Sequence, residues 1–204
     1  MRKYLAALGL LLISTMAAAE TDNIDSLLDK LAPIVGLQGE FQQFQYDEND
    51  NLVAESSGHY KLLRPGYFYW EIDSPDSQLI VADPQHIWHH DRDLETVTRR
   101  PIVDSEQMSP LQVLGGNEAL LRSSFTVEQT TDTTFSLHPK GINPGFQRLL
   151  VTFKGGVFEG LEIADNLNQR IVIGFTAVAT TPELTPTDFA FTPPQDADLF
   201  YYDE

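Results

Sequence analysis

The sequence predicts a mainly β protein, in which an antiparallel sheet of about eleven strands curls into an incomplete barrel with a few short helices on its concave side. Apolar and polar residues alternate with a period of two through most of the chain from residue 37 to 178. Turn-forming pairs such as Pro65-Gly66 and Gly155-Gly156 separate these stretches. Only two or three short stretches have helical spacing, too few to cover both faces of a sheet.

The first nineteen residues have the pattern of a cleavable secretory signal. Arg2 and Lys3 supply a positive start, Leu5–Ile13 is an apolar stretch too short to span a bilayer, and Ala17–Ala19 forms a small-residue cleavage site. We therefore expect residues 1–19 to be removed, leaving one domain over residues 20–204. A lipid-anchored product would need a Cys after the cleavage site, and the sequence contains none, so a soluble mature chain is expected.

The first element of the mature chain is expected to be a short amphipathic helix over residues 24–32. Its apolar residues recur at helical spacing after Asp22 and Asn23, either of which can cap a helix, and Pro33 ends it. The alternating pattern then predicts strands at 37–46, 57–64, 67–73, 78–82, 86–90, 94–99, 124–129, 134–138, 146–154, 157–164 and 170–178.

A helical interruption is predicted between the sixth and seventh strands. Ser109-Pro110 combines a cap with a proline suited to a first turn, and Gly115-Gly116 is a plausible stop. Residues 117–121 can add another helical turn. Near the end of the chain, residues 189–194 are expected to form a last extended segment followed by a loop.

Composition excludes several classes of function. Loss of Arg2 and Lys3 with the signal changes the formal net charge from −17 to −19, which argues against nucleic acid and anionic lipid surfaces as partners but leaves a basic protein partner open. The absence of cysteine excludes disulfides, thiolate catalysis and thiolate metal sites.

Two neighbouring predicted strands each carry an apolar row, and an arginine ends the first of them. Alternation places Tyr60, Leu62 and Arg64 on one face of a strand, and the next strand contributes the apolar residues Phe68, Trp70 and Ile72. Arg64 is either a rim residue with its charged end in solvent, or a latch whose five donors bind free carbonyls at the ends of lid helices. The aromatic row is either a filled core or the lining of an apolar cavity, because periodicity does not distinguish the two.

The sequence offers little support for a metal site or an enzyme. Among His86, His89 and His90, only the first and last share a strand face, so we expect no metal and no cofactor. Ser123, His138 and Asp165 could be imagined as a triad, but any chain of this length offers such combinations, and no nucleophile elbow, zinc-protease motif or phosphate loop occurs. We expect no catalytic residues.

Taken together, collinear segments of the chain resemble the outer-membrane lipoprotein carrier proteins, the LolA family. No single segment is diagnostic, but their order is preserved through nearly the whole mature chain. The matching segments are Leu28–Leu31, Phe41–Gln43, Gly58 through Arg64-Pro65 to Phe68 and Trp70, Asp83 and Trp88, 91–97, Ser109–Leu111, 135–140, Asp165 with Gln169-Arg170, and 189–194.

The resemblance implies an incomplete barrel closed by helices over a hydrophobic cavity for acyl chains. By position, Arg64 resembles the family's lid arginine, which bonds helix carbonyls, here expected around Leu28, Leu114 and Gly115, and this favours the latch. Phe68 resembles the rim residue that meets the transporter delivering the cargo. Tyr60, Leu62, Trp70 and Ile72 would line the cavity or its rim.

The function expected from this resemblance is that of a periplasmic chaperone. It would take acylated lipoproteins from an inner-membrane lipoprotein-releasing ABC transporter and deliver them to an outer-membrane receptor, as a monomer. The alternatives are a periplasmic lipid-binding or sensor protein that shares the half-barrel, and a periplasmic hydrolase.

Overall fold

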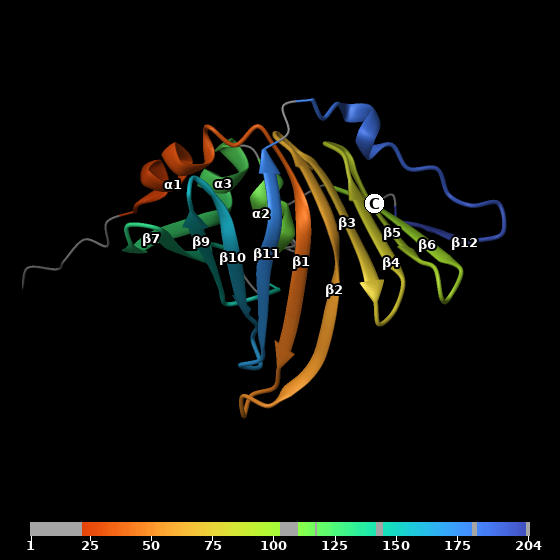
Figure 1. The fold of residues 1–204 in the computed structure, drawn as a ribbon, viewed down its shortest axis with the longest axis horizontal. Helices are drawn as coiled ribbons and strands as arrows, with labels where there is room; N and C mark the ends of the chain where they lie inside the picture. The colour runs from red at the N-terminus through yellow and green to blue at the C-terminus, as the bar shows by residue number, and fades with distance from the viewer. Residues whose placement is uncertain (1–21, 103–109, 117, 142–144, 181–182, 203–204) are drawn as a thin grey trace, which may run out of the picture.

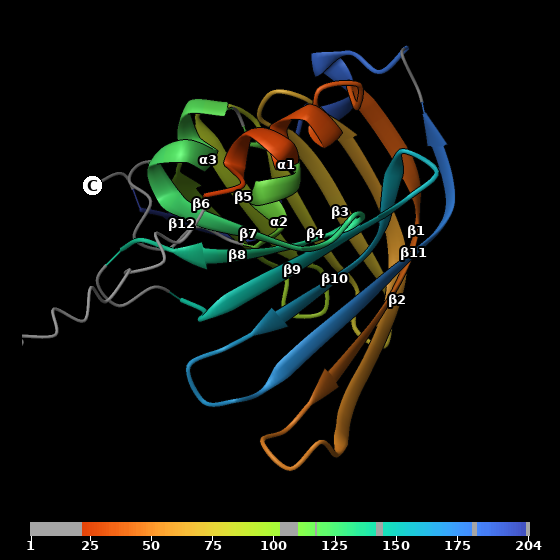
Figure 2. The same ribbon diagram turned by 90° about the vertical axis from the view of Figure 1, so that its left-hand side faces the viewer.

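The computed structural model describes residues 22–102, 110–116, 118–141, 145–180 and 183–202. Twelve strands form one open sheet in the order β12-β6-β5-β4-β3-β2-β1-β11-β10-β9-β8-β7. Figure 1 shows the sheet curling around the three short helices, and Figure 2 shows those helices lodged between its two wings. The predicted fold class, an incomplete β-barrel carrying short helices, is confirmed. The expected export signal lies outside the described residues.

The strands of the sheet correspond closely to the alternating pattern in the sequence. Their bounds are β1 Gly36–Tyr46, β2 Leu52–Leu63, β3 Tyr67–Ser74, β4 Gln78–Ala82, β5 His86–Asp91, β6 Thr96–Pro101, β7 Phe125–Thr131, β8 Thr134–Pro139, β9 Arg148–Lys154, β10 Val157–Ala164, β11 Arg170–Thr180 and β12 Asp198–Tyr201. Neighbours are antiparallel except β12, which runs parallel to β6. Antiparallel pairing of β1 with β11 joins the two halves of the chain.

The helices present their apolar residues to the concave side of the sheet. They are α1 Ile24–Leu31, α2 Pro110–Gly115 and α3 Glu118–Ser124. Ile24, Leu27 and Leu31 are buried on one stripe of α1, as the helical spacing predicts. Leu121 of α3 is completely buried in the same core cluster. In the described residues, no helix is long and apolar enough to cross a membrane.

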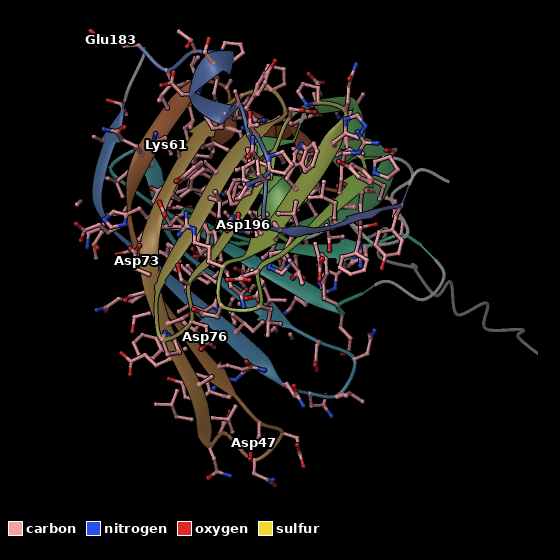
Figure 3. All side chains as sticks on the ribbon, turned by 90° about the vertical axis from the view of Figure 1, so that its right-hand side faces the viewer. Asp47, Lys61, Asp73, Asp76, Glu183 and Asp196 are labelled. Carbon is pink, nitrogen blue, oxygen red and sulfur yellow. The ribbon has the colours of Figure 1, made fainter. Side chains whose placement is uncertain are left out.

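A C-terminal strap, residues 183–202, crosses the convex face of the sheet. It contains the 3-10 helix η2 Pro186–Phe189 and ends in β12. Phe189 is buried against Leu79 and Val81 in a second, smaller apolar cluster. Figure 3 shows this outer face, with Asp196 of the strap in front of the strands and Lys61 of β2 and Asp73 of β3 labelled on the same face.

The C-terminal strap departs from the expectation of an extended segment at 189–194 followed by a loop. Phe189 ends η2, and the residues after it continue without regular structure. The last strand instead lies at 198–201, where all four residues are exposed. Alternation did not identify it, because a strand exposed on both faces has no buried side to mark.

Candidate functional site

The turn between β2 and β3 is held between the ends of two helices. Arg64 donates from Nη2 to the backbone oxygen of Gly116, just beyond α2, at 3.0 Å. Its Nη1 donates to the backbone oxygen of Leu31, the last residue of α1, at 3.4 Å. The first bond is short and the second is long, so Arg64 ties α2 to the sheet more firmly than it ties α1.

Backbone hydrogen bonds reinforce the same junction. The N–H of Arg64 donates to the oxygen of Val35 at 2.8 Å, and that of Gly66 donates to the oxygen of Gly115 at 2.6 Å. Gly66 has a φ of +91°, which glycine adopts without strain. We call Arg64 with its partners Leu31, Val35, Gly115 and Gly116, together with Gly66, the lid junction.

The lid junction differs in detail from the one expected. Arg64 bonds none of the three anticipated residues: the oxygen of Leu28 accepts the N–H of Ala32, and that of Gly115 accepts Gly66. Leu114 instead contributes its side chain, which is 1% exposed, to the core. The last four carbonyls of a helix have no partner within it, so which of them Arg64 reaches depends on the other donors nearby. Ala32 and Gly66 take two of the anticipated carbonyls, and Arg64 bonds those of Leu31 and Gly116.

The electrostatics of Arg64 suit this position. Burial lowers the pKa of its guanidinium, but an arginine stays charged at neutral pH. Its positive charge faces the carboxyl end of α1, where the helix dipole is negative. Both acceptors of the Arg64 side chain are neutral backbone carbonyls, so hydrogen bonds rather than a carboxylate compensate its charge in these two contacts.

The aromatic row predicted on β2 and β3 lies in the interior, beneath the helices. Tyr60, Leu62, Phe68 and Trp70 are each 3% exposed or less, and Ile72 packs against them. Trp70 stacks on Phe41 of β1 with ring centroids 3.6 Å apart and on Phe68 at 5.7 Å. Leucines of α1, α2 and α3 belong to the same cluster, namely Leu27, Leu31, Leu114 and Leu121. The helices therefore cover an apolar sheet interior.

Phe68 is an interior residue in this structure rather than an accessible rim residue. Its side chain is 3% exposed and contacts Trp70, so a partner protein cannot reach it while the helices are in place. Its contact with a transporter stays a prediction, and it requires the lid to move first.

Tyr60 is the polar exception in this interior. Its ring fits against Gly39, where an added Cβ would lie 3.0 Å from the ring and 2.8 Å from the oxygen of Thr176. Among the residues that the structure describes, the Tyr60 hydroxyl has no hydrogen-bond partner. Burial raises the pKa of Tyr60 to about 12. The aromatic row thus carries a polar group into an apolar interior.

The structure shows other contacts for His89, His90 and the imagined triad. His89 faces the same side as Ile80 and bonds Gln78 at 3.2 Å, whereas His90 packs on Phe191 of the strap. No group of three potential metal ligands occurs in the described part of the chain. The hydrogen bonds of Ser123, His138 and Asp165 go to other neighbours, namely Leu120, Ser136, Leu167 and Gln169.

Sequence reasoning missed three contributors to this site. Leu31 and Gly116 supply the carbonyls to Arg64, and Phe41 supplies the stacking partner of Trp70. Gly116 could have been found as the second glycine of the helix stop. Phe41 could have been found from alternation on the first strand, but its contact with β3 depends on how the sheet curls.

Sequence comparison identifies one family over most of the chain. The family described as Outer membrane lipoprotein carrier protein LolA matches residues 33–192. An outer-membrane lipoprotein carrier protein of Methylococcus capsulatus is 34% identical over 202 residues, which cover 97% of each chain. A protein of the same name from Alcanivorax borkumensis is 31% identical over 182 residues, covering 87% of each chain.

Solved structures of distant sequences share the fold. A LolA superfamily protein from Nitrosomonas europaea aligns with a TM-score of 0.50 at 10% identity, covering 82% of this chain and 97% of that one. An uncharacterized conserved protein from Thermus thermophilus aligns with a TM-score of 0.54 at 13% identity, covering 87% of this chain and 98% of the other.

Proposed function

The chain belongs to the outer-membrane lipoprotein carrier protein (LolA) family, and we propose on this premise that it is a periplasmic chaperone for acylated lipoproteins. Its close relatives are named lipoprotein carriers, and the carriers of this family are not enzymes. The proposal requires no catalytic group in this chain. It requires an apolar surface that can be covered and uncovered.

The observation that carries the proposal is the covered apolar interior. The apolar faces of α1, α2 and α3 pack on a sheet interior rich in aromatics, and the lid junction joins α1 and α2 to the sheet through a few hydrogen bonds. Displacing the helices would expose a concave apolar surface of the kind that binds acyl chains. Covering it when empty avoids aggregation.

The energetics favour such a carrier. A chain of about sixteen carbons costs on the order of 12 kcal/mol to expose to water, at about 0.8 kcal/mol per methylene. Unassisted transit between two membranes is therefore very slow. Hydrogen bonds from a charged donor contribute about 1.5–3 kcal/mol each, so the two from Arg64 are small beside the free energy gained by burying acyl chains.

The proposed pathway has an inner-membrane and an outer-membrane partner. An ABC transporter would load the carrier and supply the energy, since this chain has no phosphate-binding motif. An outer-membrane receptor would accept the cargo. The signal-like residues 1–19 support a periplasmic location.

Release of lipoproteins from spheroplasts tests this function. Purified mature protein added to spheroplasts should release an acylated lipoprotein into the supernatant as a one-to-one complex. The same lipoprotein with its acylated cysteine replaced by serine, targeted by a cleavable signal, should not copurify. Failure to bind the acylated cargo would refute the carrier role. Binding of acylated and unacylated forms alike would instead indicate recognition of the protein part.

A further inference from the structure

The two edges of the sheet differ in whether their backbone groups have hydrogen-bond partners. At the β7 edge, the chain before α1 supplies partners: Asn23 donates its backbone N–H to Val127, and the side chains of Asp22 and Asn23 accept from Val127 and Gln129. At the other end, no strand in the described part of the chain pairs with the outer side of β12.

The open edge of β12 carries specific outward-facing backbone groups. Asp198 donates its N–H to Glu95, and Tyr202 donates to Arg99, so alternate residues of this segment bond β6. In a parallel pair the residues between them turn their N–H and C=O the other way. Leu199 and Tyr201 therefore present backbone donors and acceptors to the open edge.

The side chains of this edge are unusual for an unprotected strand. Edges are normally blunted by charge, proline or a covering element. Here Leu199, Phe200, Tyr201 and Tyr202 are 43–53% exposed and consecutive. An exposed apolar strand edge of this kind is a template for another extended chain.

The interior of the sheet leads directly to this edge. Cross-strand partners share a face, and one row of partners runs from the core outward: Trp70, Ile80, His89, Thr98 and Phe200. Four strand spacings of about 4.8 Å place Phe200 roughly 19 Å from Trp70 along the sheet. Exposure rises along the row from 1% at Trp70 to 49% at Phe200.

The chemistry of the row changes in the same direction. Trp70 and Ile80 are aromatic and hydrocarbon, and His89, bonded to Gln78, and Thr98 then bring hydrogen-bonding groups before the exposed ring of Phe200 ends the row. On the strand of Thr98, Arg100 lies against the ring of Tyr202 at 5.0 Å. Polar groups near the open edge and an apolar interior match a ligand that is apolar at one end and peptide-like at the other. An acylated lipoprotein has that construction where its lipid joins the chain.

We propose that the open edge of β12 binds the extended peptide segment next to the acylated residue of the cargo, by adding it as a further strand. The inference rests on the proposed carrier function. With acyl chains in the interior, the row from Trp70 to Phe200 leads the attached peptide to Leu199 and Tyr201, whose backbone groups pair with it. Such pairing reads the main chain of the peptide rather than its sequence.

A proline substitution tests the backbone pairing directly. Leu199→Pro removes the outward N–H and leaves the bonds to β6 intact, as proline permits on an edge strand. Leu199→Ala is the matched control, because it removes the side chain and keeps the N–H. The probes are a diacylated cysteine alone and the same group followed by a ten-residue polar peptide, both measured by displacement of a fluorescent apolar dye.

The expected result distinguishes binding of the peptide from binding of the lipid. The peptide-bearing probe should bind Leu199→Pro about 3- to 10-fold more weakly than the unsubstituted protein and Leu199→Ala, whereas the diacylated cysteine should bind all three equally. The peptide-bearing probe alone should slow amide hydrogen exchange at residues 199 and 201. Equal binding of both probes by all three proteins would overturn the inference and leave the carrier function standing.

Two other outcomes would also overturn it. If the unsubstituted protein is a dimer that Leu199→Pro converts to a monomer, the edge is an interface between copies of this chain. If neither probe binds the unsubstituted protein, the carrier function fails and the edge has no cargo to receive.

Discussion

Arg64 joins segments that lie 33 and 52 residues away in the sequence. Its two side-chain bonds reach the ends of α1 and α2, and the backbone of the same turn bonds the residues beside them. Few side chains could replace it, because a lysine offers one compact ammonium where arginine offers a planar fork that spans two acceptors. A single residue thereby couples two helices to the sheet.

Replacing Arg64 with leucine should loosen the helices without unfolding the sheet. We expect amide exchange in α1 and α2 to accelerate by about ten- to a hundredfold, because at least one charge-assisted bond is lost and the carbonyl of Gly116 loses the donor from Arg64. Hydrogen exchange followed by mass spectrometry measures this. Arg122→Leu is the control, because Arg122 also links helices, through Asp25 and Glu118, but is exposed.

The same variant should still bind acylated cargo. Faster exchange in α1 and α2 with cargo retained would agree with a latch. Exchange identical to that of the unsubstituted protein would show that apolar packing alone holds the helices.

Tyr60 retains a hydroxyl group where phenylalanine would fit. A buried hydroxyl without a partner costs about 1–3 kcal/mol, so Tyr60→Phe should raise the free energy of unfolding by about 1 kcal/mol at pH 7. Urea denaturation measures the change. A loss of stability would mean that the hydroxyl is satisfied in solution.

The pH dependence of Tyr60→Phe gives a second check. The pKa of Tyr60 is raised from its ordinary value near 10 to about 12 in the folded protein, so the unfolded chain loses this proton first. The folded state of the unsubstituted protein should therefore lose stability as the pH rises from 10 towards 12. Tyr60→Phe should lose less over that range.

Among the elements, the C-terminal strap is held against the sheet mainly by one side chain, that of Phe189. Phe189 is 3% exposed and lies between β4 and the ring of Tyr67, at a centroid distance of 5.6 Å. The strap covers Leu79 and Val81, which would otherwise be exposed on the convex face. It also carries β12 to the edge of the sheet.

Truncating Phe189 should release the strap. Phe189→Ala is expected to cost about 3 kcal/mol and to accelerate amide exchange from residue 184 to β12, while the core strands change little. Phe200→Ala is the control, because Phe200 belongs to the same strap but is 49% exposed. Exchange unchanged in β12 would show that its pairing with β6 does not depend on the burial of Phe189.

Prediction of the elements succeeded where one face is buried. Most strands and α1 were found within a few residues, because a buried side imposes its period on the sequence. The first five residues of β2, Leu52–Ser56, were missed, and four of them are exposed. β12 was missed for the same reason.

On the scale of the whole molecule, the sheet is joined into one by pairing between distant parts of the chain. β1 pairs with β11 from Leu37↔Thr180 to Tyr46↔Arg170, which brings the two runs of hairpins together. This pairing leaves β7 and β12 as the two edges of the sheet that the structure describes. One edge is covered by the segment before α1, and in the described part of the chain no strand pairs with the other. The asymmetry places the proposed peptide pairing at one end of the sheet.

The sequence by itself determined the mainly β class, the order of the strands along the chain, the apolar stripe of α1 and the row containing Trp70, since each follows from a local period. Only the tertiary structure decided that Arg64 bonds Leu31 and Gly116, that the Tyr60 hydroxyl is buried, and that β12 lies parallel to β6 at an open edge. Local periods report which side chains are buried. Hydrogen bonds across the sheet depend on which segments meet, and that is fixed only when the whole chain curls around its helices.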